Sequence, residues 1–241
     1  MTKVIEVDRS FKVWWHLTRP HTLTASFVPV FLGTTIALTI EGEMINFPLF
    51  LALLVASMLI QAATNMFNEY YDYKLGLDNE HSVGIGGTIV RHGVAPSTIM
   101  AIALSFYGIA LLLGIYICAM SSWWIAAVGL VCMLIGYLYT GGPYSIAYSP
   151  FGELVSGTVM GMEIVLIAFF IQTKTVTLEA ILLSVPSMIL VGAIMLSNNI
   201  RDIVGDTEGG RKTMAILVGR HNAVYILSLF FIVSYLWIAG L

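Results

Sequence analysis

Polar side chains recur at helical spacing near the ends of two apolar stretches. The first stripe has spacings of four, three and four residues and consists of Gln61, Asn65, Asn68 and Asp72. The second has spacings of three and four and consists of Asn199, Asp202 and Asp206. These spacings place each stripe on one face of a helix. A helix end that leaves a bilayer explains one such stripe equally well, but two on the same side predict a shared site.

The residue types of the two stripes indicate a hard cation. Clustered carboxylates raise each other's pKa unless a cation lies between them. Oxygen ligands without cysteine or a histidine pair suit Mg²⁺ rather than zinc. Because Mg²⁺ usually shares a few carboxylates with substrate phosphates, the stripes predict a site for a diphosphate held by Mg²⁺.

Basic residues in the same segments could receive phosphate oxygens. They are Lys74, Arg91, Arg201, Arg211 and Lys212. Ordinary positive-inside topology explains about half of them. We favour Arg91 and Lys212 as phosphate ligands, because each lies in a glycine-containing loop beside a stripe. The segment from Ser82 to Gly93 is glycine-rich but has no P-loop signature, and it suits either an anion-binding backbone or a flexible cap over the site.

The composition of the chain indicates which kind of structure holds these residues. The chain has 241 residues, of which 58% are hydrophobic and 10% charged, more apolar surface than a soluble core of this size can bury. We therefore expect an all-α, polytopic transmembrane bundle, formed by residues 1–241 as a single membrane-embedded domain. About seven spans of membrane length are expected, at residues 22–40, 46–68, 97–119, 122–140, 152–172, 178–199 and 223–241.

The basic residues also predict the orientation. With seven crossings, every Lys and Arg except Lys174 lies on the side of the N-terminus, and cytoplasmic loops retain basic residues. We therefore place the N-terminus and the loops near 69–96, 141–151 and 200–221 in the cytoplasm. The membrane is expected to be a bacterial plasma membrane. The opposite loops are short, which leaves the cytoplasmic mouth as the place for a site.

Three segments carry a family resemblance, which runs from residue 16 to the end of the chain. They read NEYYDYKLGLD, YTGGPYSIAY and NNIRDIVGDTEGGRKTMAILVGR. Together they resemble the UbiA superfamily of intramembrane aromatic prenyltransferases, and most of all its branch that prenylates 1,4-dihydroxy-2-naphthoate in menaquinone biosynthesis. The resemblance implies a helical bundle around a central cavity, with two Asp-rich motifs facing each other at the cytoplasmic mouth.

The resemblance also implies site residues. There Mg²⁺ holds the diphosphate of a polyprenyl donor, and its ligands map to Asn68, Asp72, Asp78, Asn199, Asp202 and Asp206. Many members have the last carboxylate of the first motif at the place of Gly76, whereas this chain has Asp78. The family typically has nine helices, and this chain stops at Leu241 inside an apolar run, so we expect it to be truncated or to lack the last two helices.

The implied reaction needs a group to stabilise an allylic cation and a group to hold the acceptor. The metal and the basic residues stabilise the departing diphosphate. Tyr139, in the YTGGP segment, is expected to face the cation with its ring, although an interfacial tyrosine belt explains such residues too. Glu153 is expected to position the aromatic acid. The residues expected to bind substrate are Asn65, Asn68, Lys74, Arg201 and Glu153, and those expected in catalysis are Asp72, Asp202, Asp206, Arg91, Lys212 and Tyr139.

Other functions remain open from the sequence. A different phenolic acceptor such as 4-hydroxybenzoate fits the same motifs, because ring size is determined by cavity shape. A membrane carrier also uses intramembrane acids, but here the acids gather at one mouth and the far side has few polar groups. The expected partners are polyprenyl diphosphate, an aromatic acid and the lipid bilayer, and no nucleic acid.

Overall fold

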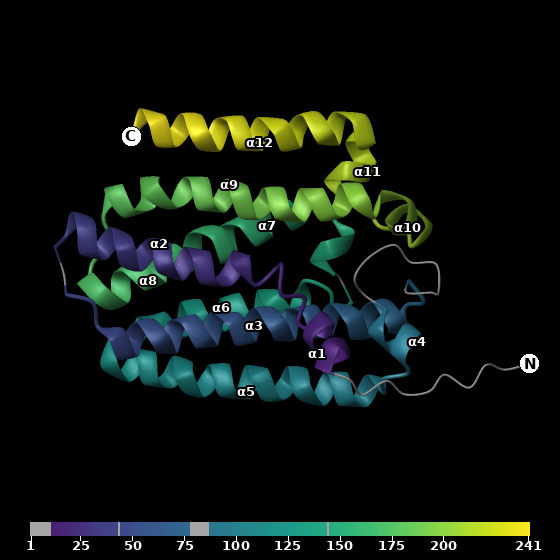
Figure 1. The fold of residues 1–241 in the computed structure, drawn as a ribbon, viewed down its shortest axis with the longest axis horizontal. Helices are drawn as coiled ribbons and strands as arrows, with labels where there is room; N and C mark the ends of the chain where they lie inside the picture. Colours follow the sequence, from purple (N-terminus) through teal and green to yellow (C-terminus); the bar gives the residue numbers. More distant parts are fainter. Residues whose placement is uncertain (1–10, 43, 78–86, 144) are drawn as a thin grey trace, which may run out of the picture.

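The protein is an antiparallel bundle of helices aligned along one axis (Figure 1). The computed structural model describes residues 11–42, 44–77, 87–143 and 145–241. Asp78, predicted as a metal ligand, and residues 82–86 of the glycine-rich segment lie outside the described residues.

Five helical segments of the described chain are long and apolar enough to cross a membrane. They are α3 (Phe47–Lys74), α5 (Pro96–Met120), the segment Gly152–Thr173, α9 (Leu178–Arg201) and α12 (Arg220–Gly240). Two shorter apolar helices, α2 (Thr24–Ile40) and α6 (Trp124–Leu138), lie among them. Each predicted span coincides with one of these segments, so the predicted multi-pass helical bundle is confirmed.

Local sequence explains where two long helices begin. Asn46 precedes α3, and its side chain accepts a hydrogen bond from the Leu49 backbone N–H. Thr177 precedes α9 and caps it in the same way through the Ala180 N–H. Such caps satisfy backbone donors that a helix start leaves unpaired. Helix α3 continues beyond its apolar part to Lys74, which carries the first polar stripe out of the apolar region on one helical face.

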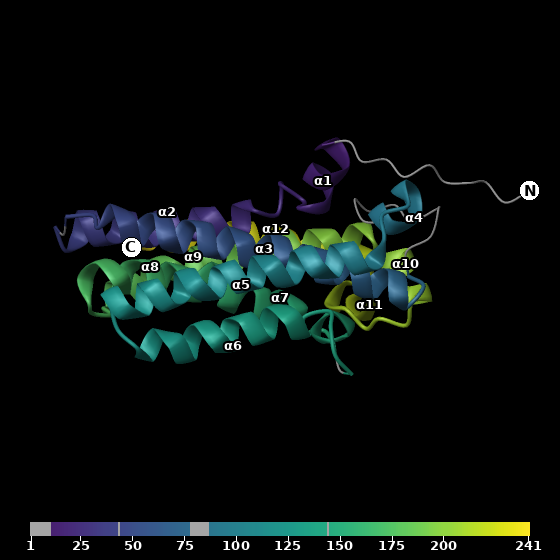
Figure 2. The ribbon, with the colours of Figure 1, turned by 90° about the horizontal axis from the view of Figure 1, so that it is seen from below.

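Short elements gather at one end of the bundle. They are α1 (Phe11–Leu17), α4 (Thr88–His92), the 3₁₀ turn η1 (Ile146–Tyr148), α10 (Ile203–Glu208) and α11 (Met214–Val218). Figures 1 and 2 show α4, α10 and α11 at the end where both polar stripes terminate. This end is the mouth of the site described below.

The segment Gly152–Thr173 is not a continuous α-helix. It consists of α7 (Gly152–Ser156), a π-helical stretch η2 (Gly157–Glu163) and α8 (Ile164–Thr173). A Cβ added at Gly157 or Gly161 would lie 2.5 or 2.6 Å from backbone atoms at Met188 of α9 or beside it. Only glycine permits this approach, so the two backbones pack directly against each other.

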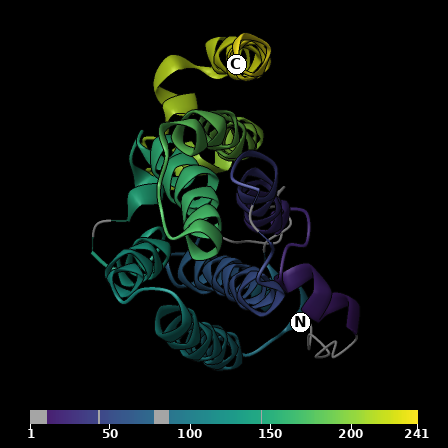
Figure 3. The same ribbon diagram turned by 90° about the vertical axis from the view of Figure 1, so that its left-hand side faces the viewer.

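The outer faces of the bundle are apolar. Figure 3, which views the bundle along its axis, shows α12 at the edge against α9. The Trp237 indole N–H of α12 donates to the Leu182 carbonyl at 2.9 Å. Apolar side chains on the outer helices are exposed, for example Leu112 at 67% and Leu236 at 67%, as expected of surfaces that face lipid.

Candidate active site

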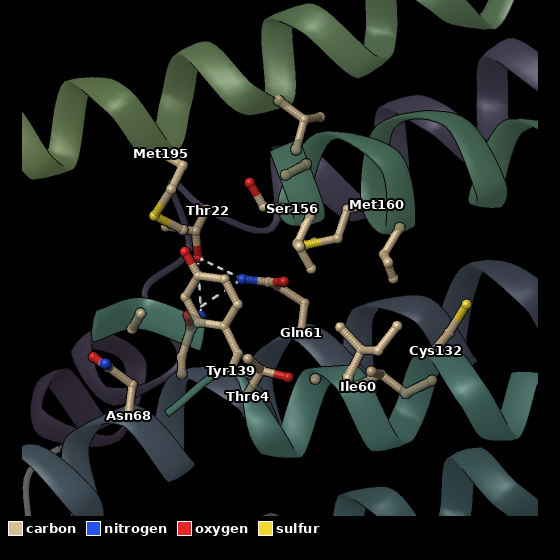
Figure 4. Close-up of a pocket in the computed structure, with 18 of the residues that line it drawn as sticks. Thr22, Ile60, Gln61, Thr64, Asn68, Cys132, Tyr139, Ser156, Met160 and Met195 are labelled. Atoms are coloured by element: carbon tan, nitrogen blue, oxygen red, sulfur yellow. Dashed lines mark hydrogen bonds between the residues drawn. The ribbon is translucent and has the colours of Figure 1, made fainter. Parts of the chain in front are cut away.

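A large cavity extends from the mouth into the bundle. Its volume is about 1250 Å³, and its lining comes from α2, α3, α5, α6, η1, α7, η2, α8, α9, α10 and the first residue of α12. Lining residues on α3 extend from Leu53 to Asp72, which corresponds to about 28 Å of helix at 1.5 Å per residue. Figure 4 shows Ser156 and Met160 of the segment Gly152–Thr173, Met195 of α9 and Tyr139, which follows α6, pointing into it.

The two ends of the cavity differ in chemistry. The deep end is lined by apolar side chains, among them Leu53, Ile117, Ile125, Ile164 and Ile167. The mouth is lined by polar and charged side chains, among them Asn68, Asp72, Asn199, Arg201, Asp202, Asp206 and Arg211. A ligand with a charged head and a long apolar tail matches this distribution.

The centre of the mouth is a buried ionic cluster that joins the two predicted stripes. The Arg211 guanidinium donates from Nη2 to Asp72 Oδ1 at 2.6 Å and from Nη1 to Asp206 Oδ1 at 2.9 Å. The side chains of Arg211, Asp72 and Asp206 are 12%, 13% and 9% exposed. The structure thus brings the carboxylates of α3 and α10 to one cation.

The loop before α11 holds the backbone of Arg211 in place. Gly210, directly before it, has a φ of +74°, a conformation that favours glycine. The Arg211 backbone N–H donates to the Asp206 carbonyl at 2.9 Å. The Lys212 N–H donates to the Tyr148 carbonyl at 3.1 Å, and the Tyr148 ring centroid lies 5.3 Å from the guanidinium carbon. These contacts point the arginine side chain into the mouth.

Burial and charge act in opposite directions on this cluster. Burial raises the pKa of the Asp206 carboxyl above its usual value, and the Arg211 guanidinium opposes the rise. Burial alone would lower the pKa of Arg211, but the Asp72 and Asp206 carboxylates raise it above its usual value. The arginine is therefore charged. Asp206 Oδ2 and Arg211 Nε are buried without a hydrogen-bond partner among the described residues, so the cluster retains unused polar capacity.

The Asp202 carboxylate pairs with a different arginine, Arg201. The Arg201 side chain donates to it from Nε at 2.8 Å and from Nη2 at 2.6 Å. Both side chains line the cavity, and they are 40% and 30% exposed. Because this pair faces solvent, water screens it more than the Arg211 cluster.

Glu153 and Asn199 form a second buried contact near the mouth. The Asn199 Nδ2 donates to Glu153 Oε1 at 2.9 Å. Glu153 is 2% exposed, and its Oε2 has no partner among the described residues. Tyr139 lines the cavity close by, and its hydroxyl would lie 2.9 Å from a Cβ added at Gly152.

Asn65 connects α3 to the segment before α2. Its Nδ2 donates to the Thr18 carbonyl at 2.8 Å and to Thr22 Oγ1 at 2.9 Å. Gln61 donates to Asn65 Oδ1 at 3.2 Å. The Asn65 amide thus supports the wall of the cavity, and its predicted role in binding substrate stays a prediction.

Three predicted phosphate ligands lie away from the cavity. Lys74, Arg91 and Lys212 are exposed, and none of them is among the described residues that line the cavity. Their catalytic or binding roles also stay predictions. Arg211, one of the five basic residues of these segments but not one that the sequence favours, instead lies at the centre of the mouth. The feature of the sequence that could have selected Arg211 is its place directly after two glycines in GGRKT.

A buried carboxylate that the sequence analysis overlooked positions α4. Glu69 is 2% exposed and accepts hydrogen bonds from the backbone N–H groups of Gly87 at 3.0 Å and Ile89 at 3.1 Å. Arg19 lies 3.8 Å from the same carboxylate. Glu69 therefore fixes the start of α4 to α3 beside the first stripe.

The donor set at the mouth fits Mg²⁺. Asn68, Asp72, Asp202 and Asp206 supply amide and carboxylate oxygens to one cavity, and Asp206 Oδ2 is buried without a partner among the described residues. These are the ligand types that Mg²⁺ prefers. In the described part of the chain, no three His, Cys, Asp or Glu side chains are close enough to hold a metal as they stand. The position between Asp72 and Asp206 is taken by the Arg211 guanidinium.

Comparison with known proteins identifies the family. Residues 26–241 match the UbiA prenyltransferase family. The chain belongs to this family. This UbiA chain is 61% identical over 230 residues to the 1,4-dihydroxy-2-naphthoate octaprenyltransferase of Bacillus subtilis, covering 95% of the chain and 73% of that enzyme. It is 31% identical to UbiA prenyltransferase domain-containing protein 1 of Xenopus tropicalis, covering 90% of the chain and 63% of that protein.

A solved structure supports the UbiA fold. The UbiA homolog from Archaeoglobus fulgidus, bound to GPP and Mg²⁺, superposes with a TM-score of 0.68 at 16% identity. The match covers 95% of this chain and 77% of that one. At this identity the likeness establishes the arrangement of helices and nothing finer.

Proposed function

We propose that this UbiA chain transfers a polyprenyl group from polyprenyl diphosphate to 1,4-dihydroxy-2-naphthoate, with loss of carbon dioxide, in menaquinone biosynthesis. The observation that carries the proposal is the 61% identity to the Bacillus subtilis naphthoate prenyltransferase along 95% of the chain. The cavity supports it, because a charged mouth above an apolar interior suits a diphosphate with an isoprenoid tail.

The mouth residues would hold the diphosphate in place. Asp72, Asp206, Asp202 and Asn68 would hold Mg²⁺, which neutralises charge on the diphosphate as its bond to the allylic carbon breaks. Arg211 and Arg201 would receive phosphate oxygens, since guanidinium groups match them in geometry. The predicted contributions of Lys74, Arg91, Lys212 and Asp78 from the surrounding loops belong to the same proposal.

The interior would protect the allylic cation. The apolar walls below the mouth exclude water, which would otherwise capture the cation. The Tyr139 ring faces the cavity and would stabilise positive charge through its π face. Attack by the ring carbon that bears the carboxylate forms the new carbon–carbon bond, and the carboxylate departs as carbon dioxide. Glu153, held by Asn199, would position the acceptor.

The mouth would face the cytoplasm. Apart from Lys174, the described Lys and Arg residues lie at this end, in or beside α1, α4, α10 and α11 or at the adjoining ends of α3, α9 and α12, in accordance with the positive-inside rule. The protein would thus lie in the bacterial plasma membrane and take its charged donor head group and aromatic acid from the cytoplasmic side.

A prenyl-transfer assay tests the proposal. The purified protein in detergent receives a radiolabelled polyprenyl diphosphate and either 1,4-dihydroxy-2-naphthoate or 4-hydroxybenzoate, with Mg²⁺ or with EDTA. We expect a lipid product from the naphthoate only, dependent on Mg²⁺ and accompanied by released carbon dioxide. Product from 4-hydroxybenzoate alone would show that 4-hydroxybenzoate, and not the naphthoate, is the acceptor. No product from either acceptor would contradict the proposed reaction.

A further inference from the structure

The Arg211 side chain occupies the position that lies between the two carboxylate-bearing helices. It bonds to Asp72 on α3 and to Asp206 on α10, which are separated from it by 139 and five residues. With both carboxylates ionised, the cluster contains two negative charges and one positive charge. A guanidinium thus neutralises only half of the negative charge gathered there.

We propose that Arg211 is a positioning residue that substitutes for the divalent cation, holding Asp72 and Asp206 together until Mg²⁺ binds, and that the displaced guanidinium then binds the diphosphate. This inference rests on the proposed function, because it takes the metal and the diphosphate from it. It adds an order of events and a residue that the sequence motifs do not select.

The first support is that the cluster is incompletely satisfied. Asp206 Oδ2 and Arg211 Nε are both buried and have no hydrogen-bond partner among the described residues. Leaving a buried polar atom of a charged group unpaired is costly. A metal ion at the carboxylates would satisfy Asp206 Oδ2, and a phosphate oxygen at the guanidinium would satisfy Arg211 Nε. The ion pair between Asp206 and Arg211 satisfies neither atom.

The second support is that the backbone of Arg211 is fixed while its side chain borders the cavity. The Arg211 and Lys212 N–H groups are bonded to Asp206 and Tyr148. Thr213, which follows, is 1% exposed and accepts from the Ile216 N–H at the start of α11. The long Arg211 side chain lines the cavity, so its guanidinium can move from the carboxylates into the mouth by rotation of side-chain bonds alone.

The third support is the contrast with Asp202. Its partner Arg201 is the adjacent residue, and the pair is 40% and 30% exposed. Removing Arg201 would leave that carboxylate in contact with water. Removing Arg211 would leave two buried carboxylates facing each other, which increases their affinity for any available cation.

Metal and pyrophosphate binding test the proposal without catalysis. Isothermal titration calorimetry on the purified full chain measures Mg²⁺ alone, and then inorganic pyrophosphate at saturating Mg²⁺. For Arg211→Gln we expect Mg²⁺ to bind about tenfold more tightly, because the competing positive charge is gone, and pyrophosphate to bind about tenfold more weakly. Arg211→Lys keeps the charge without the planar fork and should lie between Arg211→Gln and wild type in both affinities.

Arg220→Gln is the matched control, because Arg220 also lines the cavity but forms no ion pair among the described residues. It should change Mg²⁺ affinity less than twofold. Thermal unfolding measures how the substitution affects stability with and without the metal. Arg211→Gln should melt at a lower temperature than wild type in EDTA and at the wild-type temperature in saturating Mg²⁺. If the Gln variant does not survive in EDTA, the Lys variant provides the comparison.

The outcomes separate the inference from the proposed function. Unchanged or weaker Mg²⁺ binding by Arg211→Gln would contradict the claim that Arg211 takes the place of the metal ion. Unchanged pyrophosphate binding would contradict the claim that the guanidinium then binds the diphosphate. Wild-type protein that binds neither Mg²⁺ nor pyrophosphate would instead contradict the proposed function itself.

Discussion

Individual side chains at the mouth are held by polar partners from different helices. Asp72 and Asp206 meet Arg211, while Glu153 accepts from the Asn199 amide. Such cross-helix bonds are costly to break where water cannot replace them. The site is therefore preorganised by the same contacts that hold the mouth of the bundle together.

The Glu153 contact gives a prediction at this scale. Glu153→Leu leaves the partly buried Asn199 amide without its acceptor, which should destabilise the protein by about 1–3 kcal/mol. Glu153→Gln keeps an acceptor oxygen of the same shape and should melt close to wild type. Thermal unfolding of both variants in the same detergent measures the difference. Equal melting temperatures for the Leu and Gln variants would show that the hydrogen bond is not needed for stability.

Spacing predicted part of the site, and tertiary structure decided the rest. Asp72 could be selected from sequence because helical periodicity places it on one face of α3 with Gln61, Asn65 and Asn68. The single helix expected for the second stripe is wrong, because α9 ends at Arg201 and Asp206 lies on the separate helix α10. The loop cations could not be ranked, because the direction of a loop side chain depends on the path of its backbone. Arg211 points inward through its bonds to Asp206 and its glycine turn, whereas Lys212 next to it is exposed.

At the scale of elements, apolar length determined the helices well. The predicted span 178–199 corresponds to Leu178–Arg201, and the predicted span 97–119 to Pro96–Met120, because a bilayer sets the length of an apolar helix. The π-helical stretch Gly157–Glu163 was not predicted, since its hydropathy is that of an ordinary span. The stretch packs closely against α9, a contact between segments that are distant in sequence.

That packing predicts the effect of adding one methyl group. Gly161→Ala forces a Cβ to within 2.6 Å of the Met188 Cα and should destabilise the protein by about 1–3 kcal/mol. Gly108→Ala is the control, because Gly108 lies within α5 and nothing is within 4 Å of its added Cβ. Thermal unfolding of the two variants measures the effect. If they melt at the same temperature, the backbone contact between η2 and α9 does not hold the segment in place.

Helix α4 is attached to α3 through the Glu69 carboxylate. Both Glu69 oxygens accept backbone N–H groups, so Glu69→Gln presents a donor to one of them and should release the start of α4. We expect amide hydrogen exchange at residues 87–92 to become about tenfold faster. Glu179→Gln, which changes an acidic residue in the first turn of α9, is the control and should leave this exchange unchanged. Unaltered exchange in Glu69→Gln would mean that other contacts hold α4.

At the scale of the whole molecule, the distribution of basic residues predicts the orientation. The structure places α10 at the end of the bundle with α4 and α11, and the link between α8 and α9 at the opposite end. In a background without Cys118 and Cys132, a membrane-impermeant maleimide should label Thr175→Cys in intact cells. It should label Glu208→Cys only after the cells are opened. The reverse pattern would place the mouth outside the cytoplasm.

The most direct test of the central claim is the Mg²⁺-dependent prenylation of 1,4-dihydroxy-2-naphthoate by wild type, Asp72→Asn and Asp206→Asn. If these carboxylates hold the metal and the diphosphate, each substitution should reduce turnover by about a hundredfold or more, while Glu179→Gln at the far end of α9 keeps the wild-type rate. Full Mg²⁺-dependent turnover by both Asn variants would contradict the account of the mouth as the catalytic site.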